Sequence, residues 1–259
     1  MNRPSLVLTA VFLIGITTTL SIAKQPEAAA IKVPLAGIPG YERVTYRVKW
    51  LNVPVGTLVV SVKGIKKIRE RDAYEIEIIA KTNDLCSKIY KVDDRYVSYI
   101  DAKELYALRH EVYRREGRYK KDAVTDFDQI NHRAHFRNFL DRSEKNFDIP
   151  SRVQDPVSAY YYFRTIPMVI GSGATFWVCN NESNYQMFGV VEKRELVKIP
   201  GIGQREGLFI QPYAALDGKV VRKGKASGYF SCDEKRLPLI AILRAPLFTT
   251  IVAYVEKVE

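Results

Sequence analysis

Hydrophobic and polar residues alternate along most of the chain beyond position 40, and a period of two residues predicts β-strands. In the segment AYEIEIIAKT, Tyr74, Ile76 and Ile78 would share one face, with two glutamates on the other, as in a half-buried strand. Similar runs, bounded by Gly, Pro, Asn, Asp or charged residues, are VTYRVKW, GTLVVSVKGI, DRYVSYID, ELYALRHEVYRRE, GRYKKDAVTDFDQ and INHRAHFRNF. Turn signals about ten residues apart favour a meander of antiparallel strands.

The segment DPVSAYYYFRTIP breaks this alternation and predicts a short helix. The side chain of Asp155 can accept hydrogen bonds from the exposed amides of a first helical turn, and Pro156 fits the first helical position. The helix should end before Pro167. Because the four aromatic residues from Tyr160 to Phe163 are consecutive, they cannot all face one way, so both sides of the helix should be at least partly covered.

After the helix the strand pattern returns, in TFWVCN, YQMFGVVEKRELVKI, REGLFIQPYAAL, KVVRKGKASGYFSC, LPLIAILR and FTTIVAYVE. Asp217 and Gly218 both tolerate the positive φ of a type I′ turn and predict a hairpin. The loop PGIGQREG at positions 200–207 lacks the Gly-Lys-Ser/Thr ending of a phosphate loop, so we interpret it as a hairpin loop. The final run is apolar on both faces, which predicts a buried strand.

The first 23 residues have the pattern of a secretory signal peptide. Arg3 precedes an apolar run from Leu6 to about Leu20, and the small residues Ser21 and Ala23 follow it. The alternative is an uncleaved anchor, but a spanning helix needs roughly 20 apolar residues and this run is shorter. We therefore expect cleavage after Ala23 and a periplasmic protein.

The domain organisation follows from this division. Residues 1–23 are the predicted signal peptide, and residues 24–40, rich in Ala and Pro, are a flexible lead-in. Residues 41–259 should form a single β domain, long enough to bury its own core. With no cysteine near Ala23, the sequence gives no sign of lipid attachment there.

The chain is basic, with 40 Lys and Arg residues against 29 Asp and Glu and a formal net charge of +11. Removing Arg3 with the signal peptide leaves +10. Export separates a protein from most of the nucleic acid of the cell. The expected partner is therefore an anionic lipid headgroup or an acidic glycan of the envelope. The alternative is that the charge serves solubility alone.

Three cysteines, Cys86, Cys179 and Cys232, are widely spaced. An oxidising compartment would allow one disulfide and one spare thiol, and the sequence does not select the pair. The chain contains no Cys-x-x-Cys spacing, so it has no zinc or dithiol redox motif of that kind.

Three segments in order, YRVKWLNVPVGTLVVSV at 46–62, DPVSAYYYFR at 155–164 and SGYFSCDEKRLPL at 227–239, resemble a family of bacterial exported proteins, the domain of unknown function 3108. The resemblance implies a mainly β fold, a curved antiparallel sheet or open β-barrel with one short inserted helix. It implies no known activity and supplies no catalytic residues. Its general look is similar to the open barrels of periplasmic lipoprotein carriers, an analogy of fold that does not determine function.

Candidate catalytic or metal residues are few. On a strand, the spacing of three between His132 and His135 sends them to opposite faces, so they could share a metal only in a helical or irregular segment. We expect these two and His110 to lie at the surface or rim. The sequence has no Gly-x-Ser-x-Gly motif, and GSGA around Ser172 lacks that shape, although a triad can assemble from distant residues. The sequence thus assigns no catalytic, cofactor or metal site.

The basic stretch from Arg109 to Lys121 interleaves two tyrosines with Arg, Lys and His side chains. If Glu111, Tyr113 and Arg115 share one strand face, Arg114 lies on the other. The favoured interpretation is a solvated outer strand whose charges prevent edge pairing, and the alternative is a patch for an anionic ligand or membrane. The later DEKR at 233–236 should be a polar turn.

The chain has 16 tyrosines, 11 phenylalanines and 2 tryptophans, most of which should fill the core. A helix covering a curved sheet could also leave an apolar cleft for a lipid tail or amphiphile. The first hypothesis is therefore a non-catalytic binding or carrier protein for an apolar or anionic envelope component. The alternatives are a structural or assembly partner in the envelope, and an envelope hydrolase built on a concave cluster of His with carboxylate or Ser.

Overall fold

The computed structural model describes residues 38–221, 225–245 and 249–259, which form fifteen strands and two helices. The helices are α2 (Asp84–Ser87) and α3 (Pro156–Thr165). The strands are β1 (Glu42–Trp50), β2 (Val53–Ile68), β3 (Arg71–Thr82), β4 (Asp93–Asp101), β5 (Ala107–Glu116), β6 (Tyr119–Asp128), β7 (Arg133–Asn138), β8 (Glu144–Asp148), β9 (Gly173–Asn180), β10 (Ser183–Ile199), β11 (Gly203–Leu216), β12 (Lys219–Val220), β13 (Lys225–Ser231), β14 (Pro238–Ala245) and β15 (Thr249–Val258). The predicted signal peptide and most of the lead-in lie outside the described residues.

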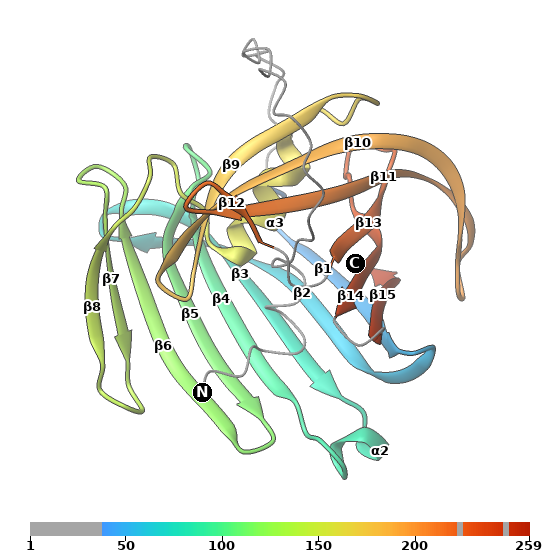
Figure 1. Cartoon of the computed structure of the whole chain (residues 1–259), viewed down its shortest axis with the longest axis horizontal. Coiled ribbons are helices and arrows are strands. Elements are labelled where there is room, and N and C mark those ends of the chain that lie inside the picture. The colour runs from blue at the N-terminus through green and yellow to red at the C-terminus, as the bar shows by residue number, and fades with distance from the viewer. Residues whose placement is uncertain (1–37, 222–224, 246–248) are drawn as a thin grey trace.

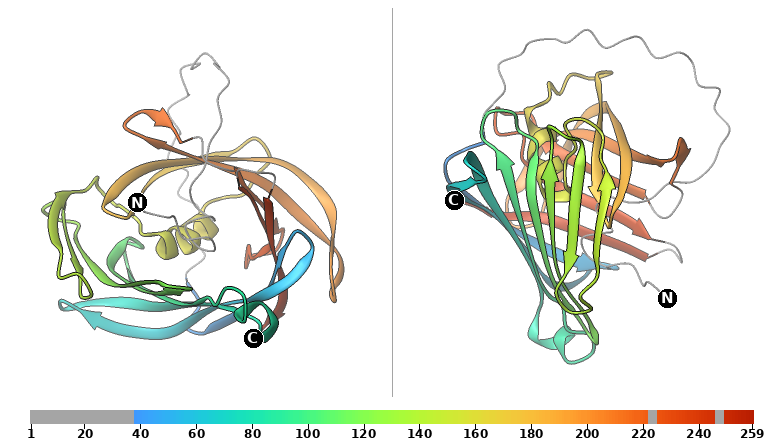
Figure 2. Two further views of the ribbon diagram at one scale, coloured as in Figure 1. Left: turned by 60° about the horizontal axis from the view of Figure 1, so that its bottom comes forward. Right: turned by 90° about the vertical axis from the view of Figure 1, so that its left-hand side faces the viewer.

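All fifteen strands belong to one antiparallel sheet, which confirms the predicted fold class. The first eight form the predicted meander, and β1 then pairs with β15, so that the two ends of the folded chain meet inside the sheet. From β15 the order continues through β14, β13, β11 and β10 to β9, while β12 pairs with β11. The sheet curls on itself as an open barrel with β8 and β9 at its edges (Figures 1 and 2).

A short extended segment before α3 bridges part of the opening. The backbone of Gln154 donates to Trp177 and accepts from Cys179, both on β9, at 2.8 and 2.7 Å. On its other side, the amide of Ala107 donates to the carbonyl of Val153 at 3.3 Å. These bonds join the β9 side to the start of β5 and hold the barrel partly closed.

The alternation seen in the sequence becomes an inner and an outer face. Ile76 and Ile78 of β3 are buried inward, as predicted. The outward Glu77 pairs with Lys63 at 2.8 Å and with Arg95 at 2.7 Å, which links three neighbouring strands across the outer face. The period of two therefore sets both the core and the ion pairs that cover it.

Helix α3 lies against the concave face of the sheet (Figure 2). Its N-terminus is a capping box, in which Asp155 accepts from the amides of Val157 and Ser158 while the hydroxyl of Ser158 accepts from the amide of Asp155. The predicted start, Pro at the first turn and end before Pro167 are confirmed. Among the described residues, no helix has the length and apolar character needed to cross a membrane.

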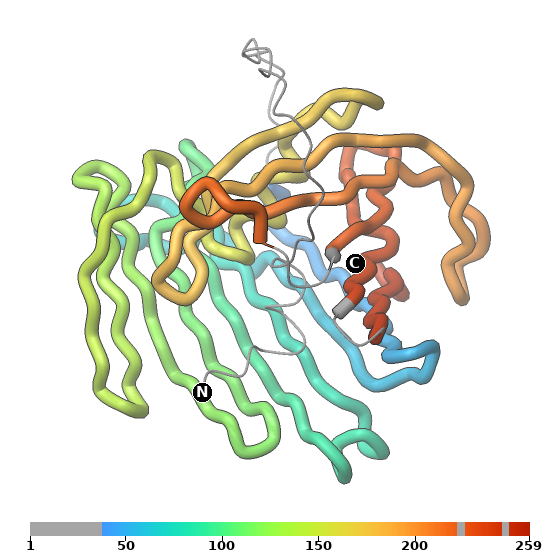
Figure 3. The backbone as a smooth tube through the Cα atoms, viewed as in Figure 1, coloured from blue at the N-terminus to red at the C-terminus, as the bar shows by residue number. Residues whose placement is uncertain are grey.

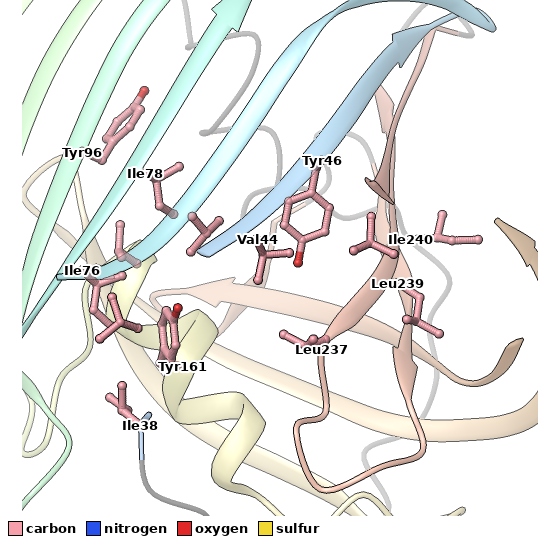
Figure 4. Close-up of a cluster of buried hydrophobic side chains, with 14 of the residues drawn as sticks. Ile38, Val44, Tyr46, Ile76, Ile78, Tyr96, Tyr161, Leu237, Leu239 and Ile240 are labelled. Carbon is pink, nitrogen blue, oxygen red and sulfur yellow. The ribbon is translucent and has the colours of Figure 1, made fainter. Parts of the chain in front are cut away.

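The largest core cluster packs the aromatic helix onto the first three strands (Figure 4). Tyr161 is 1% exposed and contributes to one cluster with Val44, Tyr46 and Ile76. The other three consecutive aromatic residues of α3 are half-buried, so both sides of the helix are covered, as predicted.

The later strands agree with most expectations. Asp217 and Gly218 adopt φ of 50° and 73° in the turn between β11 and β12. The stretch 200–207 contains the turn of the β10–β11 hairpin, as predicted. The final strand is interior in the sheet, but only Val255 is buried, so the prediction of a buried strand is wrong for most of it. The reason is that its inward residues Ile251 and Ala253 line a cavity.

Candidate functional site

A cavity of about 170 Å³ lies between α3 and the concave face of the sheet. Its walls come from both halves of the barrel and from the helix, and they are almost entirely apolar. Representative wall residues are Val48, Leu58, Ile78, Phe163, Phe176 and Ile251. An apolar concave pocket of this kind is where a small hydrophobic ligand binds in most proteins.

The cavity exists because small residues face inward in one row across β13, β14 and β15. Gly228 pairs with Ala241, and Ala241 pairs with Ala253, so three adjacent positions across the sheet lack a large side chain. A Cβ on Gly228 would come within 2.6 Å of the carbonyl oxygen of Ile240, so only glycine fits there. Sequence reasoning missed this row because no local motif shows the register that aligns Gly228, Ala241 and Ala253 across these neighbouring strands.

Two tyrosine hydroxyl groups are hydrogen-bonding groups in the otherwise apolar wall of the cavity. Tyr46 of β1 and Tyr160 of α3 both line the cavity, and their oxygens are 3.1 Å apart. Burial raises the pKa of each phenol above its ordinary value, so both stay neutral and can donate or accept a hydrogen bond. Sequence analysis placed Tyr160 in an aromatic helix and gave no signal for Tyr46.

Next to this pair, a buried ion pair holds α3 to the sheet. Arg164 donates two hydrogen bonds to the carboxylate of Glu42, at 2.7 and 2.8 Å, and the hydroxyl of Tyr161 donates a third at 2.9 Å. Burial, the largest single influence, would lower the pKa of Arg164, but the hydrogen bonds to Glu42 and the electrostatic effects of Glu42, Tyr160 and Tyr161 together raise it. Since Glu42 neutralises it, this arginine positions the helix and offers no free charge to a ligand.

A second polar cluster lies on the inner face of β4 and β5. Asp94 is fully buried and accepts hydrogen bonds from the Arg115 amide at 2.8 Å and the Tyr96 hydroxyl at 3.1 Å. Burial, followed by the adjacent Glu116, raises the pKa of Asp94 to about 7. Arg114 donates to Glu116 at 2.7 Å. Asp94 can therefore hold a proton near neutral pH.

The three histidines occupy separate places. His110 is buried beside Tyr96, with ring centroids 6.4 Å apart, and burial lowers its pKa. The expectation of a surface or rim histidine is wrong there, because even-numbered positions of β5 face the concave side. His132 lies exposed in the β6–β7 turn, and His135 lies on β7 within 3.5 Å of Glu144. In the described part of the chain, no group of His, Cys, Asp and Glu is arranged to hold a metal ion.

Serine, histidine and aspartate do meet on the inner face, but not as a triad. Ser98 pairs with His110 across the sheet, yet its hydroxyl donates to Asp155 at 2.5 Å. No partner within the described chain accepts from or donates to Nε2 of His110. A serine nucleophile needs a hydrogen bond to its histidine base, so this arrangement serves the N-cap of α3 instead. Ser172 donates to Val169 within its own loop at 2.5 Å.

The basic stretch is divided between faces, as predicted. Outward Arg109 and Arg115 pair with Asp126 and Asp122 at 2.8 and 2.6 Å, whereas Arg114 points inward. The interpretation as an edge strand is wrong, because β5 lies between β4 and β6 and its charges are matched by cross-strand acids. The later DEKR segment is the expected polar turn, in which Asp233 accepts from Ser231 at 2.6 Å.

All three cysteines are free thiols, so none of the disulfides that the sequence allowed is formed. Cys179 is buried in β9, and burial raises the pKa of its thiol to about 12. Cys86 lies in α2 and is half-buried, and Cys232 is exposed after β13. The three positions therefore add no redox or metal chemistry to the cavity.

Comparison with known proteins agrees with this architecture. The family model described as a protein of unknown function, domain of unknown function 3108, matches residues 45–247. The β-barrel-like protein of domain of unknown function 1849 from Brucella abortus superposes with a TM-score of 0.56 at 8% identity, covering 85% of this chain and 97% of that one. This likeness shows a shared fold.

Two further solved structures are more distant. One, described as a candidate exported protein with a YmcC-like fold from Bacteroides fragilis, has a TM-score of 0.35 at 7% identity and covers 86% of this chain and 97% of its own. The other, described as a candidate lipoprotein from Parabacteroides distasonis, has a TM-score of 0.36 at 7% identity and covers 85% and 96%. No curated protein matches the sequence significantly.

Proposed function

The chain belongs to the family of domain of unknown function 3108, whose description names no activity, and we propose from the geometry of the cavity that it is a non-catalytic binding or carrier protein for an amphiphile of the bacterial envelope. The apolar part of the ligand, an acyl chain or similar tail, lies in the cavity beneath α3. One observation carries this proposal: the interior of the barrel contains an apolar cavity. The alternation of hydrophobic and polar residues does not require this cavity, because it is equally compatible with an interior filled by side chains.

The size and chemistry of the cavity support a hydrocarbon ligand. Its volume of about 170 Å³ is close to that of an engineered cavity of roughly 150 Å³ that stays dry and binds benzene. Each CH₂ group transferred from water into such a space contributes about 0.8 kcal/mol. The hydroxyl pair of Tyr46 and Tyr160 could bind a polar atom near the start of the tail.

The proposed place of action is the periplasm. This part of the proposal rests on the signal-peptide pattern of residues 1–23, with Arg3 before the apolar run. The excess of basic residues favours anionic lipids or glycans over nucleic acid as partners in that compartment.

Filling the cavity tests the proposal. Ala253→Phe on β15 introduces a ring between the cavity residues Val48 and Ala241. We expect the wild-type protein to bind a fluorescent fatty acid saturably, and the variant to bind it at least tenfold more weakly, because the ring takes the space of the tail. Titration of the probe measures both affinities.

The matched control is Thr57→Phe, which adds the same ring on the exposed side of β2. This variant should bind the probe like the wild type. Equal affinities for the wild type and Ala253→Phe, or an equal loss in both variants, would contradict a ligand in the cavity. Thermal unfolding of each variant shows whether it is folded under the conditions of the titration.

A further inference from the structure

Large apolar side chains are exposed at one end of the curved sheet, in the turns drawn at the bottom of Figures 1 and 3. They belong to the β1–β2 turn, to α2 and the residues after it, and to the β7–β8 turn. Six of these residues, which we call the apolar rim, are Leu51, Val53, Leu85, Ile89, Phe139 and Leu140, and each is at least half exposed to solvent. Ile89 is 89% exposed. These residues are spread over the turns of one end of the sheet, and exposed apolar side chains gathered on one side of a molecule can mark an interaction site.

Backbone hydrogen bonds tie the turns at this end to their neighbours, and the amide of Phe139 in the β7–β8 turn donates to Asp122 of β6 at 2.7 Å. The amide of Asn83 donates to Val55 at 2.8 Å, which holds α2 against the β1–β2 hairpin. The amide of Gly117 donates to Lys91 at 2.8 Å and joins the β5–β6 turn to the segment after α2. The exposed side chains therefore project from turns that backbone hydrogen bonds hold in place.

The opposite end of the same strands is different. The β2–β3 turn carries Arg69 and Glu70, and the β4–β5 turn carries Lys103 and Glu104. The structure describes all residues of the β2–β3, β4–β5 and β6–β7 turns. Among them, Ile130 is the one exposed large apolar residue, at 78%. In the turns of these strands, exposed apolar residues are thus more numerous at the rim end. Toward the other end, Tyr41 and Ile65 are exposed at 66% and 57%, and Ile130 provides a matched control there.

Basic side chains surround the apolar rim. The exposed cations are Lys88 and Lys91 at and after α2, Arg118 and Lys120 at the β5–β6 turn, and Arg142 in the β7–β8 turn. The exposed acids at this end are Asp84, Asp141 and Glu144, so the cations are still in excess, while Asp93 pairs with Lys81 at 3.1 Å. Apolar side chains with an excess of Lys and Arg around them fit the interface of an anionic bilayer, where each basic residue near the surface adds about 1 kcal/mol.

The rim also adjoins the cavity. Trp50 follows Val48 on the inward side of β1 and pairs with Ile251 across the sheet, and both of those neighbours line the cavity. Trp50 itself is 45% exposed, between the cavity wall and the rim. The cavity wall formed by β1 and β15 therefore extends toward the end of the barrel that carries the rim.

We propose that the apolar rim is a docking surface for an anionic lipid bilayer, into whose headgroup region the turns of this end insert. The proposal concerns the outer end of the barrel and does not depend on what occupies the cavity. Charge complementarity selects a membrane over a second copy of this basic chain, whose identical rim would place like charges together.

The test uses protein purified as the cell processes it, and vesicles of phosphatidylglycerol and phosphatidylethanolamine or of phosphatidylcholine alone. The chain has two tryptophans, so Trp177→Phe leaves Trp50 as the only reporter. We expect flotation with the anionic vesicles, a blue shift of Trp50 emission on binding, and weaker binding as salt increases. Lys88→Glu with Lys91→Glu should reduce binding to anionic vesicles at least fivefold, and Lys103→Glu at the other end should leave it unchanged.

Leu85→Ser with Ile89→Ser should weaken vesicle binding at least tenfold, because it removes two of the most exposed rim side chains. Ile130→Ser, the control, should bind like the wild type. Both proteins share the same N-terminal segment, so a difference between them comes from the rim. Since Leu85 and Ile89 are 72% and 89% exposed, neither change should alter folding.

Three results would overturn the proposal. The first is a wild-type protein that does not float with anionic vesicles, and the second is an equal loss in Ile130→Ser. The third is a wild-type dimer that the rim variant dissociates without any vesicle binding, which would assign the rim to a second copy. The two proposals remain separable, because Ala253→Phe should still bind vesicles and the rim variant should still bind the fatty-acid probe.

Discussion

At the scale of the residue, the inner face of β4 and β5 brings Asp94, Glu116 and Arg114 together with little water around them. The sequence predicted correctly that Arg114 lies opposite Arg115, because alternation fixes which residues share a face. It could not predict which face is concave. The burial of Asp94 and His110 depends on that curvature, so the prediction of a surface or rim position for His110 fails.

The raised pKa of Asp94 predicts a pH dependence of stability. The folded protein keeps a proton on Asp94 up to a pH of about 7, whereas the unfolded chain loses it near 3.8. The contribution of this group to stability is therefore complete below about pH 4 and is lost as pH rises to 7, on the order of 2 to 4 kcal/mol. Asp94→Asn, which cannot ionise, should therefore gain stability relative to wild type as pH rises from 4.5 to 8.

Urea unfolding of both proteins across this range measures the difference. His110 has the opposite sign, because its lowered pKa makes the folded protein lose stability as pH falls below about 6.5. That contribution is present in both proteins and cancels. A constant difference in the free energy of unfolding between pH 4.5 and 8 would show that Asp94 titrates as an ordinary carboxyl group.

At the scale of the element, α3 is the part of the structure that the sequence predicted best. Asp155, Pro156 and the later Pro167 determine its ends through local hydrogen bonding and backbone restriction, which involve near neighbours only. The partner of Arg164 is Glu42, 122 residues earlier in the chain, and no local signal could identify it. The position of the helix over the cavity depends on this distant pair.

Glu42→Ala should therefore destabilise the protein by about 3 to 5 kcal/mol, because it leaves the buried Arg164 without its counter-charge. The double variant Glu42→Ala with Arg164→Met should recover much of this loss, since neither charge remains buried. Urea midpoints of the wild type, the two single variants and the double variant give the coupling energy. A loss below about 1 kcal/mol in Glu42→Ala would mean that the pair does not hold the helix.

At the scale of the whole molecule, a curved antiparallel sheet with one inserted helix could be predicted from the sequence, since alternation, turns and the helix signal are local. The pairing of β1 with β15 is not local, and it determines that the row Gly228, Ala241 and Ala253 faces α3. A filled barrel and a hollow one have the same alternation. The cavity is thus a property of topology and could be hypothesised from the sequence but not located.

The most direct test of the central claim is native mass spectrometry of the protein purified gently from its own envelope, followed by organic extraction of whatever leaves it. We expect one amphiphile bound per chain in the wild type, largely absent from Ala253→Phe and retained in Thr57→Phe. A wild-type protein that is reproducibly empty, or an amphiphile retained equally in Ala253→Phe, would contradict a ligand in the cavity beneath α3.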